Sequence, residues 1–177
     1  MVIGSAQPEG IVRPGVPFVR RRGGGGAVWV EPGVAWFEVF VPAGDPAWQD
    51  DVGRAFWFAG DLVADALGGL TSVRLQLHRR GLERGAIGDT VCFASRGPGE
   101  IMVDGRKLVG WTQRRTRAGS RFGGIAYPVW DPAPLARALA VELPDDVDLA
   151  KTGIGLGEVG VGSFETLLDA LVTTVTH

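Results

Sequence analysis

Hydrophobic and polar positions alternate over several short stretches of the chain, a pattern typical of half-buried β-strands. The alternation is clearest in VAWFEVFVP at residues 34–42. Two further strands, EIMV and RKLVGWTQ, flank Asp104-Gly105, a dipeptide that strongly favours a two-residue hairpin turn. On the second of these strands, alternation predicts one shared face for Lys107, Val109, Trp111 and Gln113. Shorter strands are expected at residues 16–21, 27–30, 72–78, 90–95 and 121–130.

Three other stretches repeat apolar residues every three or four positions, as amphipathic helices do. The longest begins at Asp45-Pro46, where a capping side chain precedes a proline, and ends before Gly68-Gly69. A second helix is expected after Asp131-Pro132, and a third over residues 163–175. Strands mixed with helices in this order predict an α+β fold, with a mostly antiparallel β-sheet packed with about three helices.

Length and composition fit a single globular domain. The chain has 177 residues, of which 45% are hydrophobic and 21% are charged, so it has enough apolar material to bury a core. Residues 1–15 contain glycine and proline but no periodicity, and we expect them to form a loose leader. The single domain is then expected to cover residues 16–177.

Charge and cysteine content indicate which binding partners and which cellular compartment to expect. The net charge of -2 gives no reason to expect a nucleic acid partner, and no apolar run approaches the roughly 20 residues of a membrane span. Basic residues nevertheless cluster at residues 20–22 and 114–121, which suits an acidic protein partner. The N-terminus lacks the features of a signal peptide, and the single cysteine, Cys92, has no disulfide partner in the chain. We therefore expect a cytoplasmic protein.

The stretch RRRGGGGAVWV, residues 20–30, is the first candidate for chemistry. Glycines let the backbone approach a ligand closely, and arginines suit anionic groups. The familiar phosphate-binding glycine patterns run from a strand into a helix, whereas this loop is expected between two strands, so neither pattern applies. A flexible hairpin turn is the alternative interpretation.

Cys92 and Lys107 are the other candidates. A single cysteine is most often a small buried hydrophobic residue, and a catalytic thiol needs positive charge nearby to favour the thiolate. The strand that carries Lys107 is a candidate source of that charge, although a strand lysine is more often solvated. The two histidines, His78 and His177, lack the spacing of metal ligands, so no metal site is expected.

Two segments, in this order, resemble one family. RRRGGGGAVWVEPG is similar to the RRx[ST]GGGAV signature of lipoate-protein ligases, and DGRKLVGWTQRRTRAG resembles their GRK[IL]xGSAQRR segment, part of which biotin-protein ligases share. The run TVCFASRGPGEIMV resembles the octanoyltransferases of the same superfamily, which keep a cysteine nucleophile upstream of the lysine. The resemblance implies a biotin/lipoate ligase-like catalytic domain.

The resemblance also implies transfer of a medium-chain acyl group, octanoyl or lipoyl, to a lysine of a lipoyl domain. In the transferase version, Cys92 takes octanoyl from acyl carrier protein as a thioester, and no cofactor is needed. In the ligase version, ATP and Mg²⁺ activate the acid as an acyl-adenylate. The cysteine favours the transferase, because adenylation needs no thiol. Lys107 would hold the acyl carbonyl or the adenylate phosphate. The residues implied to bind the substrate are Arg20, Arg21, Gly24, Gly25, Gly26, Ala27, Val28, Gly105, Gly110, Trp111 and Thr112.

Three positions depart from the family pattern. Gly23 replaces a serine or threonine, Val30-Glu31 replaces His-Asp, and Gly110-Trp111-Thr112 replaces Gly-Ser-Ala. If Trp111 pointed inward with Lys107, it would shorten or block the acyl tunnel. The alternatives are therefore a non-catalytic relative that binds acyl groups or carrier proteins, and a biotin ligase, which fits GRKLVG but neither the arginines nor the cysteine.

Overall fold

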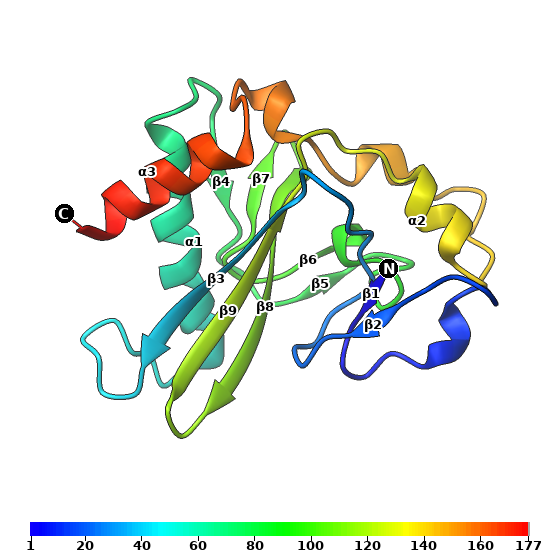
Figure 1. Ribbon diagram of the computed structural model, residues 1–177, viewed down its shortest axis with the longest axis horizontal. Helices are drawn as coiled ribbons and strands as arrows, with labels where there is room; N and C mark the ends of the chain where they lie inside the picture. The colour runs from blue at the N-terminus through cyan, green and yellow to red at the C-terminus, as the bar shows by residue number, and fades with distance from the viewer. Residues whose placement is uncertain (177) are drawn as a thin grey trace.

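Five antiparallel strands form the central sheet in the order β3-β9-β8-β7-β4 (Figure 1). The computed structural model describes residues 1–176. The strands of this sheet are β3 (Ala35–Pro42), β4 (Gln76–Leu77), β7 (Ile101–Val103), β8 (Arg106–Thr116) and β9 (Gly119–Ala126). Two small sheets accompany it: β1 (Val2–Ile3) is parallel to β2 (Val19–Arg20), and β5 (Glu83–Arg84) is antiparallel to β6 (Ser95–Arg96).

The predicted hairpin at Asp104-Gly105 joins β7 to β8. Asp104 has a φ of 48° and Gly105 a φ of 78°. A two-residue type I′ turn requires positive φ at both central residues, and aspartate and glycine adopt it most readily. The hairpin prediction is therefore confirmed for the reason that the sequence suggested.

A bulge in β8 changes which of its side chains share a face. Met102 of β7 pairs with Lys107, whereas the neighbouring Ile101 pairs with Val109. Leu108 is thus an extra residue in the ladder, and such a residue interrupts the alternation of faces.

Lys107 and Trp111 consequently lie on opposite faces of the sheet, so the prediction that they share one face is wrong. Trp111 packs edge-to-face against Phe37, with ring centroids 5.5 Å apart, inside the main core cluster. A side chain at the neighbouring Gly110 would instead contact Lys107 and Phe93. Lys107 therefore faces away from the main core, and Trp111 does not share its side of the sheet.

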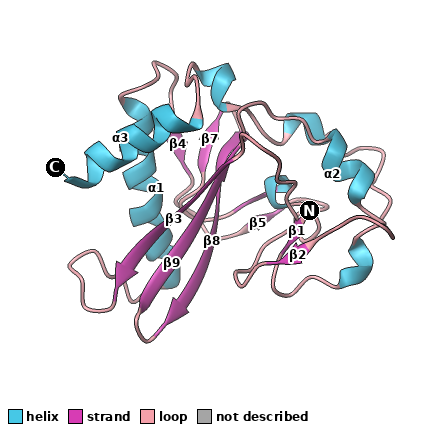
Figure 2. Cartoon of the chain, in the orientation of Figure 1, coloured by secondary structure: helices cyan, strands magenta, loops and turns pink. Residues whose placement is uncertain are grey.

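Helices α1 (Val52–Gly68) and α3 (Phe164–Thr176) cover one face of the sheet (Figure 2). Their residues Ala59 and Leu167 belong to the same buried cluster as Phe37 and Phe122 of the sheet. The shorter α2 (Ala133–Ala138) lies near the N-terminal strands (Figure 1). Three α-helices and a mostly antiparallel sheet confirm the predicted α+β class. Residues 1–176 also contain the 3₁₀ helices η1 (Glu9–Ile11), η2 (Cys92–Ala94), η3 (Leu149–Lys151) and η4 (Leu156–Val159).

The first helix begins later than the sequence predicts. Its N-cap is Asp51, whose side chain accepts a hydrogen bond from the backbone N–H of Arg54 at 2.7 Å. Asp45, the predicted start, instead accepts from the N–H of Ala47 in a separate turn. Both aspartates satisfy free N–H groups, and only the second is followed by a continuous helix.

Residues 1–15 are packed against the rest of the chain, so the prediction of a loose leader is wrong. Ile3, in β1, is fully buried, and Ile11 and Val12 are buried as well. They form a second core cluster with Leu135 and Leu139, in and directly after α2. Sequence periodicity did not reveal this packing because the segment contributes only a two-residue strand and one 3₁₀ turn.

Several predicted strands are shorter than expected or absent. Residues 27–30 form only isolated bridges, in which Val28 pairs with Val2 and Ala27 with Val91. Cys92 begins the 3₁₀ helix η2 rather than lying in a strand. Of the strand expected at residues 72–78, only β4 is formed. No helix within residues 1–176 is long and apolar enough to cross a membrane.

Candidate active site

The glycine loop at residues 23–26 is fixed in place by Arg21. The Arg21 guanidinium donates to the carbonyl of Gly24 at 2.7 Å and to that of Gly26 at 2.8 Å. From β8, the Thr112 hydroxyl also donates to the Gly24 carbonyl, at 3.1 Å. Arg21 and Thr112, both expected to bind substrate, thus shape the loop itself. Arg20 lies elsewhere, because its guanidinium donates to the carbonyls of Gly4 and Gln7.

Gly26 is required by its close approach to neighbouring groups. A Cβ at Gly26 would lie 2.6 Å from the backbone nitrogen of Cys92, which is closer than real Cβ atoms come. The residue after it, Ala27, exchanges backbone hydrogen bonds with Thr90 and Cys92. The glycine loop is therefore packed directly on the segment that carries the cysteine.

Gly23 and Thr112 fit each other sterically. A Cβ at Gly23 would collide with the Thr112 hydroxyl. The family pattern has a hydroxyl residue at the position of Gly23 and an alanine at the position of Thr112, so the hydroxyl in this chain comes from the facing strand. This exchange gives a physical reason for two of the departures from the family pattern.

Cys92, Lys107 and Glu100 form a buried cluster beneath the loop. The Lys107 side chain is fully buried, and its Nζ donates to the backbone carbonyl of Cys92 at 2.7 Å and to Glu100 Oε1 at 2.8 Å. The Glu100 carboxylate also accepts the backbone N–H of Gly97, at 2.6 Å, and that of Trp111. Lys107 is thus close to Cys92, as predicted, but it binds the main chain of this residue.

Burial controls the acid–base properties of this cluster. Burial has the largest effect on the Cys92 thiol and raises its pKa. The Lys107 ammonium lowers this pKa by a smaller amount, and still smaller effects come from Glu100, which raises it, and Arg21, which lowers it. Burial also raises the pKa of Glu100, and Lys107 and the N–H groups of Gly97 and Trp111 oppose that rise. The net direction for Cys92 is upward, so the resting thiol holds its proton. Lys107 does lower the thiol pKa, as the sequence suggested, but burial outweighs this effect.

A cavity of about 400 Å³ opens beside the cluster. β7 covers only the first part of β8, and residues 111–113 of β8, beyond the last residue paired with β7, border this cavity. Val52 and Phe56 of α1 form the apolar wall. The remaining lining includes Gly24, Gly25, Cys92, Glu100, Trp111 and Thr112. Most of the residues expected to bind substrate therefore border one space or the cluster beside it.

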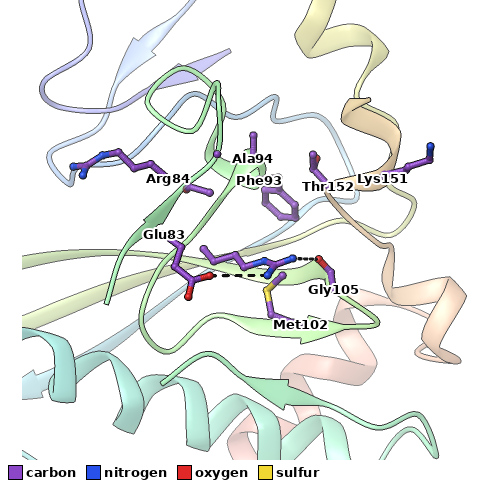
Figure 3. Close-up of a pocket in the computed structure, with 11 residues that line it drawn as sticks. Glu83, Arg84, Phe93, Ala94, Met102, Gly105, Lys151 and Thr152 are labelled. Carbon is purple, nitrogen blue, oxygen red and sulfur yellow. Dashed lines mark hydrogen bonds and ion pairs between the residues drawn. The ribbon is translucent and has the colours of Figure 1, made fainter. Parts of the chain in front are cut away.

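A second cavity, of about 310 Å³, lies beyond Phe93 and is bordered by Gly105 (Figure 3). Figure 3 shows Phe93 and Met102 directed into it and Arg84 and Lys151 directed outward. Arg96 also borders this cavity, and its guanidinium lies 3.1 Å from the Gly105 carbonyl and 4.0 Å from the Glu83 carboxylate. Gly105 was expected beside the acyl group, but it borders this separate cavity.

Glu100 is a member of this cluster that the sequence did not predict. The available signal was an acidic residue at the start of the otherwise apolar run EIMV, directly before the strand that pairs with the Lys107 strand. Within residues 1–176, no three histidine, cysteine, aspartate or glutamate side chains lie close enough to hold a metal ion.

The fold, with its glycine loop packed on the segment that carries Cys92 and a buried lysine on the neighbouring hairpin, is similar to that of several ligases of known structure. The structure is similar to lipoate-protein ligase A bound with ATP, with 19% identity and a TM-score of 0.69. It is also similar to a bipartite lipoate-protein ligase of Thermoplasma acidophilum, studied with its E2 lipoyl domain, at 16% identity and a TM-score of 0.71. The biotin-protein ligase of Aquifex aeolicus with biotin and ATP gives 13% identity and a TM-score of 0.54.

Each of these comparisons covers 99% of this chain but only 66%, 65% and 66% of the respective relative. No curated protein sequence matches the chain. The family model for the lipoyl protein ligase A/B catalytic domain matches residues 2–174. The chain belongs to this family.

Proposed function

We propose that the protein transfers a medium-chain acyl group, octanoyl or lipoyl, to a lysine of a lipoyl domain through a thioester on Cys92. The observation that carries this proposal is the position of Cys92, which lies under the glycine loop, borders the 400 Å³ cavity and is held through its carbonyl by Lys107. Adenylation would give no role to a thiol at this point. We also propose that the reaction takes place in the cytoplasm, where a free thiol stays reduced.

The reaction has two balanced steps. In the first, the Cys92 sulfur bonds to the acyl carbon of a carrier thioester, the carrier C–S bond breaks, and the thiol proton leaves with the carrier sulfur. In the second, the lysine amine of the lipoyl domain bonds to the same carbon, the Cys92 C–S bond breaks, and an amine proton restores the thiol. Each step builds negative charge on the acyl oxygen.

Lys107 supports both steps by positioning Cys92. Its bond to the Cys92 carbonyl fixes the start of η2, and with it the position of the sulfur. Glu100 holds the ammonium in place.

Intact-mass spectrometry tests this proposal directly. The wild-type chain, incubated with octanoyl-acyl carrier protein, should gain one octanoyl group that hydroxylamine removes, and Cys92→Ala should gain none. Adding a lipoyl domain should then move the group from Cys92 to the domain as a hydroxylamine-stable amide. An octanoyl group on Cys92→Ala would contradict the thioester route.

ATP-dependent lipoate ligation is the second candidate, and the protonated, buried state of the Cys92 thiol favours it. In that reaction ATP would supply the activating adenylate, with Mg²⁺ at its phosphates. Lys107 does not fit a phosphate contact as it stands, because Glu100 already holds its ammonium. Pyrophosphate release from lipoate and ATP, unchanged in Cys92→Ala, would establish this reaction. Saturable acyl-carrier binding without either reaction would indicate a non-catalytic relative.

A further inference from the structure

The sheet face opposite α1 and α3 is open along parts of β3, β8 and β9. Trp36 and Phe40 of β3 are 37% and 45% exposed. Arg22, Arg114 and Arg121 are exposed around them. We call these five residues the open sheet face. The strand pairing places Phe40 beside Arg121 and Arg121 beside Arg114. Arg22 and Trp36 border the same cavity as these two arginines.

The open sheet face carries positive charge that the described chain does not neutralise. A cavity of about 450 Å³ on it is bordered by four arginines and one carboxylate, that of Glu38. Arg121 lies 3.3 Å from Glu38, and Arg21 binds the glycine loop. Within residues 1–176, Arg22 and Arg114 have no hydrogen-bond or ion-pair partner.

Several other basic side chains within residues 1–176 have a carboxylate partner, although Arg54, Arg74, Arg117 and Arg137 have none. Arg79 pairs with Asp61, Arg84 with Asp89, and Lys151 with Asp148. The basic segment at residues 114–121 is also divided: Arg115 turns to the other side, where it binds the carbonyl of Asp50 at 2.7 Å and stacks on Trp48. Unpaired charge and exposed aromatic rings therefore coincide on the open sheet face.

This face leads to the reactive cysteine. Arg21, Trp36, Thr112 and Gly123 border both the 450 Å³ cavity and a narrow gap of about 10 Å³ that reaches Cys92. A protein bound to the open sheet face would therefore bring its own side chains to the side of the glycine loop nearest the thiol.

We propose that the open sheet face docks the acceptor domain, an acidic domain whose lysine receives the acyl group. This inference rests on the proposed function for the identity of the acceptor, and it holds for either route of acyl activation. Aromatic residues and arginine are enriched at protein interfaces, and opposite charge guides encounter and register. The arginines also disfavour the ammonium form of the incoming lysine, which leaves its amine free to attack.

Charge reversal with a matched control tests the docking surface. The wild-type chain of residues 1–177 and its variants Arg22→Glu and Arg114→Glu are titrated with a purified, fluorescently labelled lipoyl domain at low salt, and anisotropy gives the Kd. Each reversal should raise the Kd about fivefold or more and weaken its salt dependence. Arg137→Glu, an equal charge change at an exposed site on α2, should change the Kd less than about twofold.

Any of three results overturns the docking proposal. The wild type could show no saturable binding of the lipoyl domain, or Arg137→Glu could change the Kd as much as the two test variants do. The third is that the test variants weaken the binding of acyl carrier protein but not that of the lipoyl domain. Failure of the docking proposal is distinguishable from failure of the proposed function. A lipoyl domain that binds as expected but is never acylated contradicts the function and supports the docking. Acylation with the same KM in Arg114→Glu and Arg137→Glu contradicts the docking and supports the function.

Discussion

Lys107 makes two contacts that define the candidate site, and neither is with the Cys92 sulfur. Its ammonium binds the Cys92 carbonyl and the Glu100 carboxylate in a buried position. An ammonium so placed needs a compensating charge, since burial of an isolated charge is very costly. Glu100 supplies that charge, which makes the lysine and the glutamate a single unit.

We predict that Cys92 reacts slowly with alkylating agents near neutral pH. Burial raises its thiol pKa, so the thiolate fraction and the rate of iodoacetamide labelling should reach half-maximum at a higher pH than for free cysteine in the same buffer. Lys107→Met should move the midpoint higher still, because the ammonium lowers the pKa. Mass spectrometry follows the labelling, and Cys92→Ala controls for other sites. A wild-type midpoint below that of free cysteine would contradict the burial argument.

A second prediction concerns the stability of the Lys107–Glu100 pair. Glu100→Gln leaves a buried ammonium without its counter-charge and should lower the free energy of unfolding by about 3–5 kcal/mol. Urea denaturation measures this change. The double variant Glu100→Gln/Lys107→Met should recover part of the loss, because it removes both charges. If the double variant lost the sum of the two single effects, the two residues would not act as a pair.

At this scale the sequence predicted that Cys92 and Lys107 lie close together but not which contacts they make. Cys92 and Lys107 do come together, because the hairpin turn and the glycine loop have local sequence signals. Glu100 was missed, since a single acidic residue in a short strand has the same pattern as a surface charge. The mutual fit of Gly23 and Thr112 depends on a contact between segments distant in sequence, which no local pattern reports.

At the scale of elements, the glycine loop gives a prediction with an internal control. Gly26→Ala would push a Cβ against the backbone of Val91 and Cys92, and it should cost roughly 1–3 kcal/mol of stability and reduce acyl transfer. Gly24→Ala meets nothing within 4 Å and should change stability by less than about 0.5 kcal/mol. Thermal unfolding compares the two variants. Equal effects would show that the loop is not packed on the cysteine segment as described.

Elements with a complete local signal were predicted well. The hairpin has its turn residues and two alternating strands, and β3 has eight residues of alternation. The start of α1 was misplaced because Asp45 and Asp51 both have capping chemistry, and only the packing of α1 against the sheet selects the second. The bulge at Leu108 reversed the expected face of Trp111, since one extra residue exchanges the faces of all that follow.

At the scale of the whole molecule, the N-terminal segment belongs to the core, and this gives a further prediction. Ile3→Ala removes a fully buried side chain and should cost about 2–5 kcal/mol in the free energy of unfolding. Val19→Ala, in the partner strand but 62% exposed, should cost less than about 0.5 kcal/mol. Guanidinium denaturation of both variants measures the difference. Similar small effects would mean that residues 1–15 are a loose leader after all.

The unequal lengths of β7 and β8 have a consequence for how the site tolerates sequence change. The cavity borders residues 111–113 of β8, which lie beyond the part of β8 that pairs with β7. Substitutions of side chains there do not lengthen β7, whereas a longer β7 would run along these residues and close the space. Relatives with quite different residues at these positions can therefore keep the same recess, provided that the short strand stays short.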